Sequence, residues 1–328
     1  MIMVVVGVMS GFLSNTGTAA VLIPVVIGVA AKSGFTRSRL LMPLVFAAAL
    51  GGNLSLIGAP GNLIAQSALQ NIGSGFGFFE YAKVGLPMLV CGILYFLTIG
   101  YKFLPNNSNS SEVGSIGEQR DYSHVPRWKQ ILSLVVLIAT ILGMIFEKQT
   151  GISLTVAGCI GALVLVITGV LTEKQAYKAI DSQTIFIFGG TLALAKALEM
   201  TGAGKLVADQ VIGLLGNNSS PFMLLVVVFA LSVVMTNFMS NTATVALLVP
   251  VSLSIAAGMG ADPRAVLMAT VIGSSCAYAT PIGMPANMMV LSAGGYKFVD
   301  YAKSGIPLII VSTIVSLILL PILFPFHP

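Results

Sequence analysis

Two short polar segments interrupt long apolar runs of this sequence, and they are nearly identical. The first is Ser14-Asn15-Thr16-Gly17 and the second is Ser240-Asn241-Thr242-Ala243. A proline follows each segment at the same distance, Pro24 and Pro250. Polar side chains at membrane depth are costly and usually serve a function. A polar break that recurs in both halves of an apolar chain is typical of a transport site built from discontinuous helices.

The composition places these segments in a membrane protein. Of the 328 residues, 56% are hydrophobic and only 8% are charged, whereas a soluble domain has about 25% charged residues. We therefore predict an all-α polytopic membrane protein in the plasma membrane. The net charge of +5 fits basic cytoplasmic loops and does not require nucleic-acid binding.

Enzyme chemistry and transition-metal binding find no support in the sequence. The cysteines, Cys91, Cys159 and Cys276, lie far apart in apolar segments, as small buried hydrophobic residues do. His124 lies in a polar loop and His327 near the C-terminus, so neither has a second ligand beside it. There is also no HExxH motif and no intramembrane aspartate pair. We therefore predict that the protein is not an enzyme.

Three motifs recur in the same order, which predicts an internal repeat. After Ser-Asn-Thr comes Gly-x-Pro-x-Asn, at Gly58–Asn62 and Gly283–Asn287. A Tyr-Ala-Lys-x-Gly-x-Pro motif follows, at Tyr81–Pro87 and Tyr301–Pro307. The spacings between copies are 226 (240 − 14), 225 (285 − 60) and 220 (301 − 81) positions. Matched motifs in order, with little drift, are the signature of a repeat.

The domain boundaries follow from this repeat. We predict a first repeat over residues 1–104, a polar linker over 105–130 and a second repeat over 131–328. The copies differ at their starts: 109 positions separate Ile131 from Ser240 (240 − 131), but only 13 residues precede Ser14. The first repeat is therefore expected to be incomplete at its N-terminus, as in a fragment or a truncated gene product.

The Ser-Asn-Thr segments suit a site for a cation and an anion together. At a break between two helices, unpaired carbonyls end one helix and unpaired N–H groups begin the next. Carbonyl, hydroxyl and amide oxygens suit a hard cation such as Na⁺, and the N–H groups favour an anion. Two such breaks facing each other would hold a divalent anion from both sides.

Neighbouring residues are expected to complete the two sites. Ser10 and Thr236 lie four residues before Ser14 and Ser240, which would place both hydroxyls of each pair on one helix face.

The Gly-x-Pro-x-Asn motifs should break a helix and free carbonyls, with Asn62 and Asn287 capping the helix that resumes. In the third motif, the tyrosine together with the lysine, Tyr81 with Lys83 and Tyr301 with Lys303, is expected to be an interfacial anchor.

The coupling ion can also be inferred. The acidic residues cluster in loops, and none lies in the middle of an apolar segment. Proton-driven carriers usually need an intramembrane carboxylate or histidine. The sequence therefore favours coupling to Na⁺ through neutral oxygens.

With paired Ser-Asn-Thr and Gly-x-Pro-x-Asn motifs, the chain resembles the divalent anion/sodium symporters, the SLC13-type, INDY-like carriers of the ion transporter superfamily. The resemblance covers nearly the whole chain except the linker. It implies inverted repeats with re-entrant helical hairpins and broken transmembrane helices, a homodimer and an elevator-type mechanism. The implied substrates are dicarboxylates such as succinate, tricarboxylates or sulfate.

The resemblance also assigns site residues. It implies one Na⁺ site at Ser10, Ser14, Asn15 and Gly58, and another at Thr236, Met239, Asn241 and Gly283. It implies that the substrate meets Asn15, Thr16, Asn241, Thr242 and Pro285.

The chain departs from the family pattern at both breaks. Pro60-Gly61-Asn62 and Pro285-Ala286-Asn287 replace the common Pro-Pro-Asn, and Met284 stands where a small hydroxyl residue is frequent. Three alternatives remain open: a related permease for another anion or a metalloid oxyanion, a Na⁺/H⁺ exchanger, and a non-transporting truncated remnant.

Overall fold

The structure, a computed structural model, describes residues 1–106, 125–180, 182–203, 206, 210, 213 and 220–326. Within these residues every regular element is a helix. The helices are α1 (Ile2–Ser10), α2 (Asn15–Ser33), α3 (Arg37–Gly51), α4 (Pro60–Gln70), α5 (Ala82–Thr98), η1 (Gly100–Lys102), α6 (Arg127–Ile145), α7 (Glu147–Thr150), α8 (Leu154–Ile167), α9 (Glu173–Ala179), α10 (Ser182–Thr201), α12 (Pro221–Thr236), α13 (Asn241–Met259), α14 (Pro263–Ser274), α15 (Pro285–Ala293) and α16 (Phe298–Leu323).

Membrane-spanning character is clear from length and apolarity. Among the described helices, α2, α6, α13 and α16 have at least 18 residues and are apolar enough to cross a bilayer. The apolar helices α5 and α12 are shorter. The all-α membrane fold predicted from the composition is confirmed.

The helices break where the motifs predict. Residues 11–14 separate α1 from α2, and residues 237–240 separate α12 from α13. Residues 52–59 separate α3 from α4, and residues 275–284 separate α14 from α15. Each Ser-Asn-Thr motif therefore begins a helix, and each Gly-x-Pro-x-Asn motif lies where the next helix resumes.

Helix ends are also equivalent in the two halves. Helices α2 and α13 both stop at a left-handed glycine, Gly34 with φ of 73° and Gly260 with φ of 63°. Glycine adopts this conformation without the penalty that a Cβ would bring. Because the two glycines are 226 positions apart (260 − 34), the helices after both Ser-Asn-Thr motifs have the same length of 19 residues.

Two compact units can be distinguished along the chain. One comprises residues 1–116 and 186–328, and it contains both Ser-Asn-Thr motifs. The other comprises residues 117–185, where α6 packs on α8. Every predicted site residue lies in the first unit.

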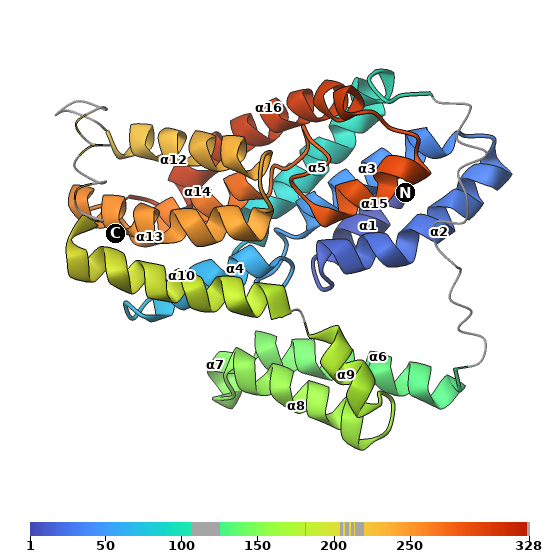
Figure 1. Ribbon diagram of the computed structural model, residues 1–328, viewed down its shortest axis with the longest axis horizontal. Coiled ribbons are helices and arrows are strands. Elements are labelled where there is room, and N and C mark those ends of the chain that lie inside the picture. The colour runs from blue at the N-terminus through green and yellow to red at the C-terminus, as the bar shows by residue number, and fades with distance from the viewer. Residues whose placement is uncertain are drawn as a thin grey trace. The chain divides into compact units, whose positions relative to one another are not determined.

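Within the first unit, helix contacts occur in matching pairs (Figure 1). Helix α3 packs on α1, α2 and α5, and α14 packs on α12, α13 and α16. The two sets also interlock, since α4 packs on α13 while α15 packs on α2. Helices α5 and α16, one from each set, pack side by side. The helix that follows each break thus lies against the Ser-Asn-Thr helix of the other half.

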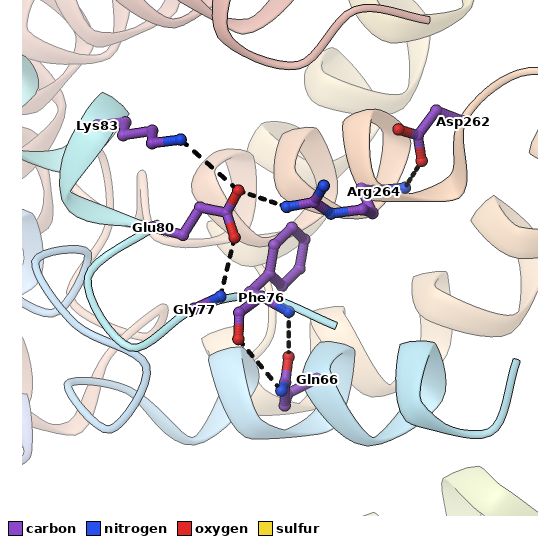
Figure 2. Close-up of polar contacts among 7 residues, drawn as sticks. All are labelled: Gln66, Phe76, Gly77, Glu80, Lys83, Asp262 and Arg264. Carbon is purple, nitrogen blue, oxygen red and sulfur yellow. Dashed lines mark hydrogen bonds and ion pairs between the residues drawn. The ribbon is translucent and has the colours of Figure 1, made fainter. Parts of the chain in front are cut away.

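A charged cluster joins the two sets of helices near the start of α14 (Figure 2). Glu80, in the loop before α5, forms an ion pair with Arg264. Its other oxygen accepts a hydrogen bond from the Gly77 N–H at 2.8 Å. The Arg264 guanidinium also lies 5.7 Å from the centroid of the Phe76 ring. The loop between α4 and α5 is therefore attached to α14.

The equivalent loop in the second half makes a neutral contact. Tyr296, which precedes α16, donates from its hydroxyl to the Ser38 carbonyl at 2.6 Å. Burial raises the pKa of Tyr296 well above its usual range, so the hydroxyl keeps the proton that it donates. The two loops thus bind the opposite half by different chemistry.

Candidate functional site

Each Ser-Asn-Thr motif forms the first turn of a helix. Ser14 is the N-cap of α2, and its hydroxyl accepts from the Gly17 N–H at 3.1 Å. Ser240 is the N-cap of α13, and its hydroxyl accepts from the Ala243 N–H at 3.2 Å. These serine caps start the helices. They leave the asparagine of each motif as the first helical residue.

The preceding hydroxyl does not share a helix face with this serine, so that prediction was wrong. Ser10 is the last residue of α1, and Thr236 is the last residue of α12. Because the chain turns before Ser14 and Ser240, each hydroxyl instead reaches the asparagine five residues later. Each hydroxyl therefore still contacts its Ser-Asn-Thr motif, but at the asparagine and across the turn between two helices.

The first oxygen cluster consists of Ser10, Asn15 and the Ala48 carbonyl. The Ser10 hydroxyl is fully buried. It lies 2.8 Å from Asn15 Oδ1 and 2.7 Å from the carbonyl of Ala48, 38 residues away in α3. A Cβ placed on Gly52 would lie only 2.5 Å from Asn15 Oδ1. The asparagine therefore packs directly on the backbone at the end of α3.

The second oxygen cluster consists of Thr236, Asn241 and the carbonyls of Ser274 and Gly283. Thr236 is fully buried, and its hydroxyl donates to the Ser274 carbonyl, again 38 residues away. With its nitrogen turned inward, the Asn241 amide lies 2.8 Å from Thr236 Oγ1, 2.9 Å from Gly283 O and 3.2 Å from Ser274 O. Three oxygens from α12, α14 and the second break thus converge on one atom.

The predicted site residues are only partly brought together. Gly283 joins the second cluster, whereas Gly58 lies against Gly52, where a Cβ would be 2.5 Å from the Gly52 carbonyl. Met239 occupies the turn between α12 and α13, and its N–H donates to Met235 O at 3.0 Å. Thr16 and Thr242 are half-buried in the first turns of α2 and α13, and Pro285 is exposed at the start of α15.

Two contributors were missed by sequence reasoning, the carbonyls of Ala48 and Ser274. Backbone oxygens carry no residue signature, so no motif could mark them. The only available signal is their position: each lies 38 residues after the hydroxyl that it binds.

The two halves meet at the first Ser-Asn-Thr motif. Asn15 Nδ2 lies 3.7 Å from the sulfur of Met284 in the second break. Methionine sulfur is a weak acceptor, and Met284 is buried. The thioether therefore occupies the space beside Asn15, immediately before Pro285.

Asn62 and Asn287 do not cap helices, so this prediction was wrong as well. They lie inside α4 and α15, which have Ala59 and Met284 at their N-caps. Asn62 Nδ2 donates to Gly52 O at 3.0 Å and to Ser55 O at 2.8 Å. Asn287 Nδ2 makes the equivalent bonds to Ala277 O at 2.8 Å and Thr280 O at 3.1 Å. Each asparagine thus fixes the backbone of its own break.

The tyrosines of the third motif are buried, not interfacial. Tyr81 and Tyr301 have no exposed surface. Their hydroxyls donate to the carbonyls of Asn62 at 3.2 Å and Asn287 at 2.6 Å. The prediction of interfacial anchoring was therefore wrong for both tyrosines. Each tyrosine instead binds the first turn of the helix that resumes after the Gly-x-Pro-x-Asn break.

The donor set of both clusters is neutral. Among the described residues there is no group of three or more His, Cys, Asp or Glu side chains that could hold a metal ion. The clusters offer hydroxyl, amide and carbonyl oxygens instead, which are ligands for hard cations rather than transition metals.

Known proteins share this sequence and fold. A family model described as citrate transporter matches residues 1–273 and 142–327. An uncharacterized transporter of Methanocaldococcus jannaschii is 31% identical over 314 residues, covering 94% of this chain and 69% of that protein. A sodium-dependent dicarboxylate transporter of Staphylococcus aureus is 25% identical over 357 residues, covering 98% and 68%.

Among solved structures, the crystal structure of the Alcanivorax borkumensis YdaH transporter aligns with a TM-score of 0.68 and 18% identity. The alignment covers 100% of this chain and 79% of that one. The likeness confirms the fold of an all-α membrane transporter. The family match confirms the resemblance to SLC13-type carriers of the ion transporter superfamily. The chain belongs to the citrate transporter family, whose members are multi-pass membrane transporters of small anions and not enzymes.

Proposed function

We propose that this protein is a Na⁺-coupled symporter of divalent anions across the plasma membrane. The substrates would be di- or tricarboxylates such as succinate, or sulfate. One observation supports this most strongly: the same pair of contacts made by a buried hydroxyl occurs twice. In each half a buried hydroxyl binds the asparagine of the motif and a carbonyl 38 residues later. A single such arrangement is ordinary helix packing, but a repeated one at two helix breaks fits a pair of ion sites.

In this proposal each oxygen cluster is the centre of one Na⁺ site, and neighbouring residues of the motifs complete it. The first ion is bound by Ser10, Ser14, Asn15 and the backbone near Gly58, and the second by Thr236, Asn241 and the backbone at Met239 and Gly283. The carbonyls of Ala48 and Ser274 add an oxygen to each. At the second cluster the Asn241 amide nitrogen occupies the point where three oxygens converge. Rotation of that amide would turn Oδ1 inward and leave a set of neutral oxygens around a cation.

The anion would bind between the two helix starts. Asn15 and Thr16 begin α2, Asn241 and Thr242 begin α13, and Pro285 begins α15. Helix N-termini carry unpaired N–H groups and a partial positive charge, both of which favour an anion. Two N-termini suit a substrate with two negative charges.

Symport follows from the shared residues. Asn15 and Asn241 belong to a cation site through the side chain and to an anion site through the helix start. A bound Na⁺ fixes the turn before each helix, which pre-organises the N–H groups for the anion, and the anion in turn stabilises both cations. Binding of each is therefore favoured by the other.

We also propose the repeat organisation, the oligomeric state and the transport movement of this protein. The matching helix contacts support two inverted repeats, with the boundaries 1–104, 105–130 and 131–328 predicted from the motifs. We further propose a homodimer in which the unit with both motifs moves across the membrane as an elevator. The sodium-dependent dicarboxylate transporter among the relatives supports the choice of ion and substrate class.

The direct test is uptake of labelled succinate and of sulfate into proteoliposomes under Na⁺, K⁺ or pH gradients. We expect uptake driven by Na⁺ and not by K⁺. Uptake indifferent to Na⁺ contradicts the mechanism, uptake that follows the pH gradient favours exchange, and no uptake under any gradient favours a non-transporting remnant.

Variants of the motifs sharpen this test. Asn15→Ala and Asn241→Ala should each abolish Na⁺-dependent uptake, because each removes an oxygen from one cation site and a group beside the anion. Asn71→Ala, at an exposed helix end, is the matched control and should transport normally. Equal uptake by all three variants would rule out the paired oxygen clusters as the site.

A further inference from the structure

One hydrogen bond joins the breaks of the two halves. The hydroxyl of Ser275, directly after α14, lies 2.8 Å from Asn53 Oδ1, although the residues are 222 positions apart, and 3.1 Å from the Val271 carbonyl of its own helix. Asn53 is fully buried and Ser275 is 5% exposed. A buried polar bond between two interrupted helices fixes their relative position.

Each partner directly follows a residue that belongs to an oxygen cluster or contacts one. Asn53 follows Gly52, whose backbone contacts Asn15 Oδ1 and whose carbonyl accepts from Asn62. Ser275 follows Ser274, whose carbonyl accepts from Thr236. A short path of peptide bonds and one hydrogen bond therefore runs from the first cluster to the second.

Asn53 cannot easily move away from this bond. A Cβ on Gly85 of α5 would lie 2.0 Å from the Asn53 carbonyl oxygen and 2.9 Å from its Cβ. The α5 backbone thus presses directly on this residue. The Asn53 Nδ2 atom is buried and has no hydrogen-bond partner among the described residues, so the bond to Ser275 is the polar contact that orients the side chain.

The bond has no counterpart in the repeat. In the second half the glycine of α16, Gly305, presses on Tyr278 in place of an asparagine. The position 226 residues before Ser275 is Ala49, which has no hydroxyl. Among the described residues, the hydroxyl–asparagine contacts of the two clusters occur in both halves, whereas this bond occurs once.

We propose that Asn53 and Ser275 are positioning residues that couple the two cation sites. The inference rests on the proposed function. A cation in one cluster draws in the carbonyl of that cluster, Ala48 O in the last turn of α3 or Ser274 O at the end of α14, and Asn53 or Ser275, just beyond that helix, transmits the shift to the other break. Occupation of one site then favours the other, and the Na⁺ dependence is steeper than for independent sites.

The test is the Na⁺ dependence of succinate uptake in proteoliposomes, together with the Na⁺ dependence of the melting temperature of the purified full-length chain. For wild type we expect a Hill coefficient of about 2, since it is limited by the number of coupled sites. Ser275→Ala and Asn53→Ala should lower it to the smaller value that two independent sites give, while uptake at saturating Na⁺ is retained. The double variant should resemble either single one, because one interaction is removed.

Ser232→Ala is the matched control. Ser232 is also buried in the second half, and its hydroxyl binds a carbonyl of its own helix, Val228 O at 2.7 Å, as that of Ser275 binds Val271 O; Ser275 differs in that it contacts Asn53 as well. It should keep the wild-type steepness. Ser275→Thr keeps the hydroxyl and should also remain steep, which gives a second comparison if Asn53→Ala fails to fold.

Three results would overturn the inference, and the last is distinguishable from the first two. Wild-type steepness in Ser275→Ala, or equal loss in Ser275→Ala and Ser232→Ala, excludes the coupling and leaves Na⁺ symport intact. A wild-type protein without any response to Na⁺ excludes the proposed function and the coupling with it.

Discussion

At the scale of single residues, the two halves make the same hydroxyl contacts with different side chains. Ser10 and Thr236 occupy equivalent helix ends, and each hydroxyl binds an asparagine and a carbonyl. The hydroxyl is common to both residues, and only Thr236 carries a methyl group. If the oxygen is the functional atom, serine and threonine should be interchangeable here.

The first prediction exchanges these residues. Thr236→Ser should retain Na⁺-dependent uptake, whereas Thr236→Ala should raise the half-saturating Na⁺ concentration by about tenfold, which corresponds to about 1.4 kcal/mol. The measurement is uptake against Na⁺ concentration at fixed substrate. A Thr236→Ser variant as impaired as Thr236→Ala would show that the methyl group, and hence packing, matters more than the oxygen.

The second prediction concerns Asn62 and Asn287. Each amide group satisfies two carbonyls in the break, and a buried carbonyl left unpaired costs about 1–3 kcal/mol. Asn62→Ala and Asn287→Ala should therefore lower the melting temperature in detergent, by several degrees each. Asn71→Ala, at an exposed helix end, should not. Unchanged melting in both buried variants would contradict the structural role of these amides.

At the scale of secondary-structure elements, the close approach of helices to the breaks is set by glycine. A Cβ on Gly85 of α5 would lie 2.0 Å from the Asn53 carbonyl, and one on Gly305 of α16 would lie 2.1 Å from the Tyr278 carbonyl. Backbone atoms cannot rotate away as side chains can. The Tyr-Ala-Lys-x-Gly-x-Pro motif therefore serves helix packing through its buried tyrosine and its glycine.

The third prediction follows from this contact. Gly85→Ala and Gly305→Ala should each destabilise the protein by about 1–3 kcal/mol, because the added methyl group would push α5 away from Asn53 or α16 away from Tyr278. Gly28→Ala is the control, since a Cβ at Gly28 of α2 meets no atom within 4 Å. It should be neutral or stabilising, as alanine favours helix by about 1 kcal/mol over glycine. Thermal melting in detergent measures all three, and equal effects would argue against close packing.

At the scale of the whole molecule, equivalent loops of the two halves contact the opposite half through different interactions. The loop before α5 reaches α14 through the Glu80–Arg264 ion pair, and the loop before α16 reaches α3 through Tyr296. The first contact depends on charge, so salt should weaken it, whereas the second should be indifferent to salt.

The fourth prediction tests the charged contact. Glu80 and Arg264 side chains are 14% and 32% exposed, and a pair of this kind is worth about 1 kcal/mol, reduced by solvent screening. Glu80→Gln and Arg264→Gln should each lower the melting temperature, and the double variant should lose less than the sum of the two. Lys83→Ala is the control, because Lys83 lies 3.8 Å from Glu80 and is 53% exposed. Additive losses in the double variant would show that the pair contributes nothing.

Particular residues show why sequence reasoning succeeded in part. Ser14 and Ser240 were placed at helix breaks because capping is local chemistry that a few neighbouring residues determine. Asn62 and Asn287 were misassigned as caps and Tyr81 and Tyr301 as interfacial anchors. Their partners lie 7 to 19 residues away, across turns whose path the sequence does not display.

The sequence by itself determined the membrane class, the helix breaks and the equivalence of the two halves. Apolar composition is a property of the whole sequence, and proline, glycine and capping residues act on their immediate neighbours. Both can therefore be recognised from the sequence alone. Only the tertiary structure decided which oxygens converge. The carbonyls of Ala48 and Ser274, and the single bond from Ser275 to Asn53, depend on helices that pack across 38 or 222 residues. Backbone atoms are the same in every residue, so only their placement in space can give them a role.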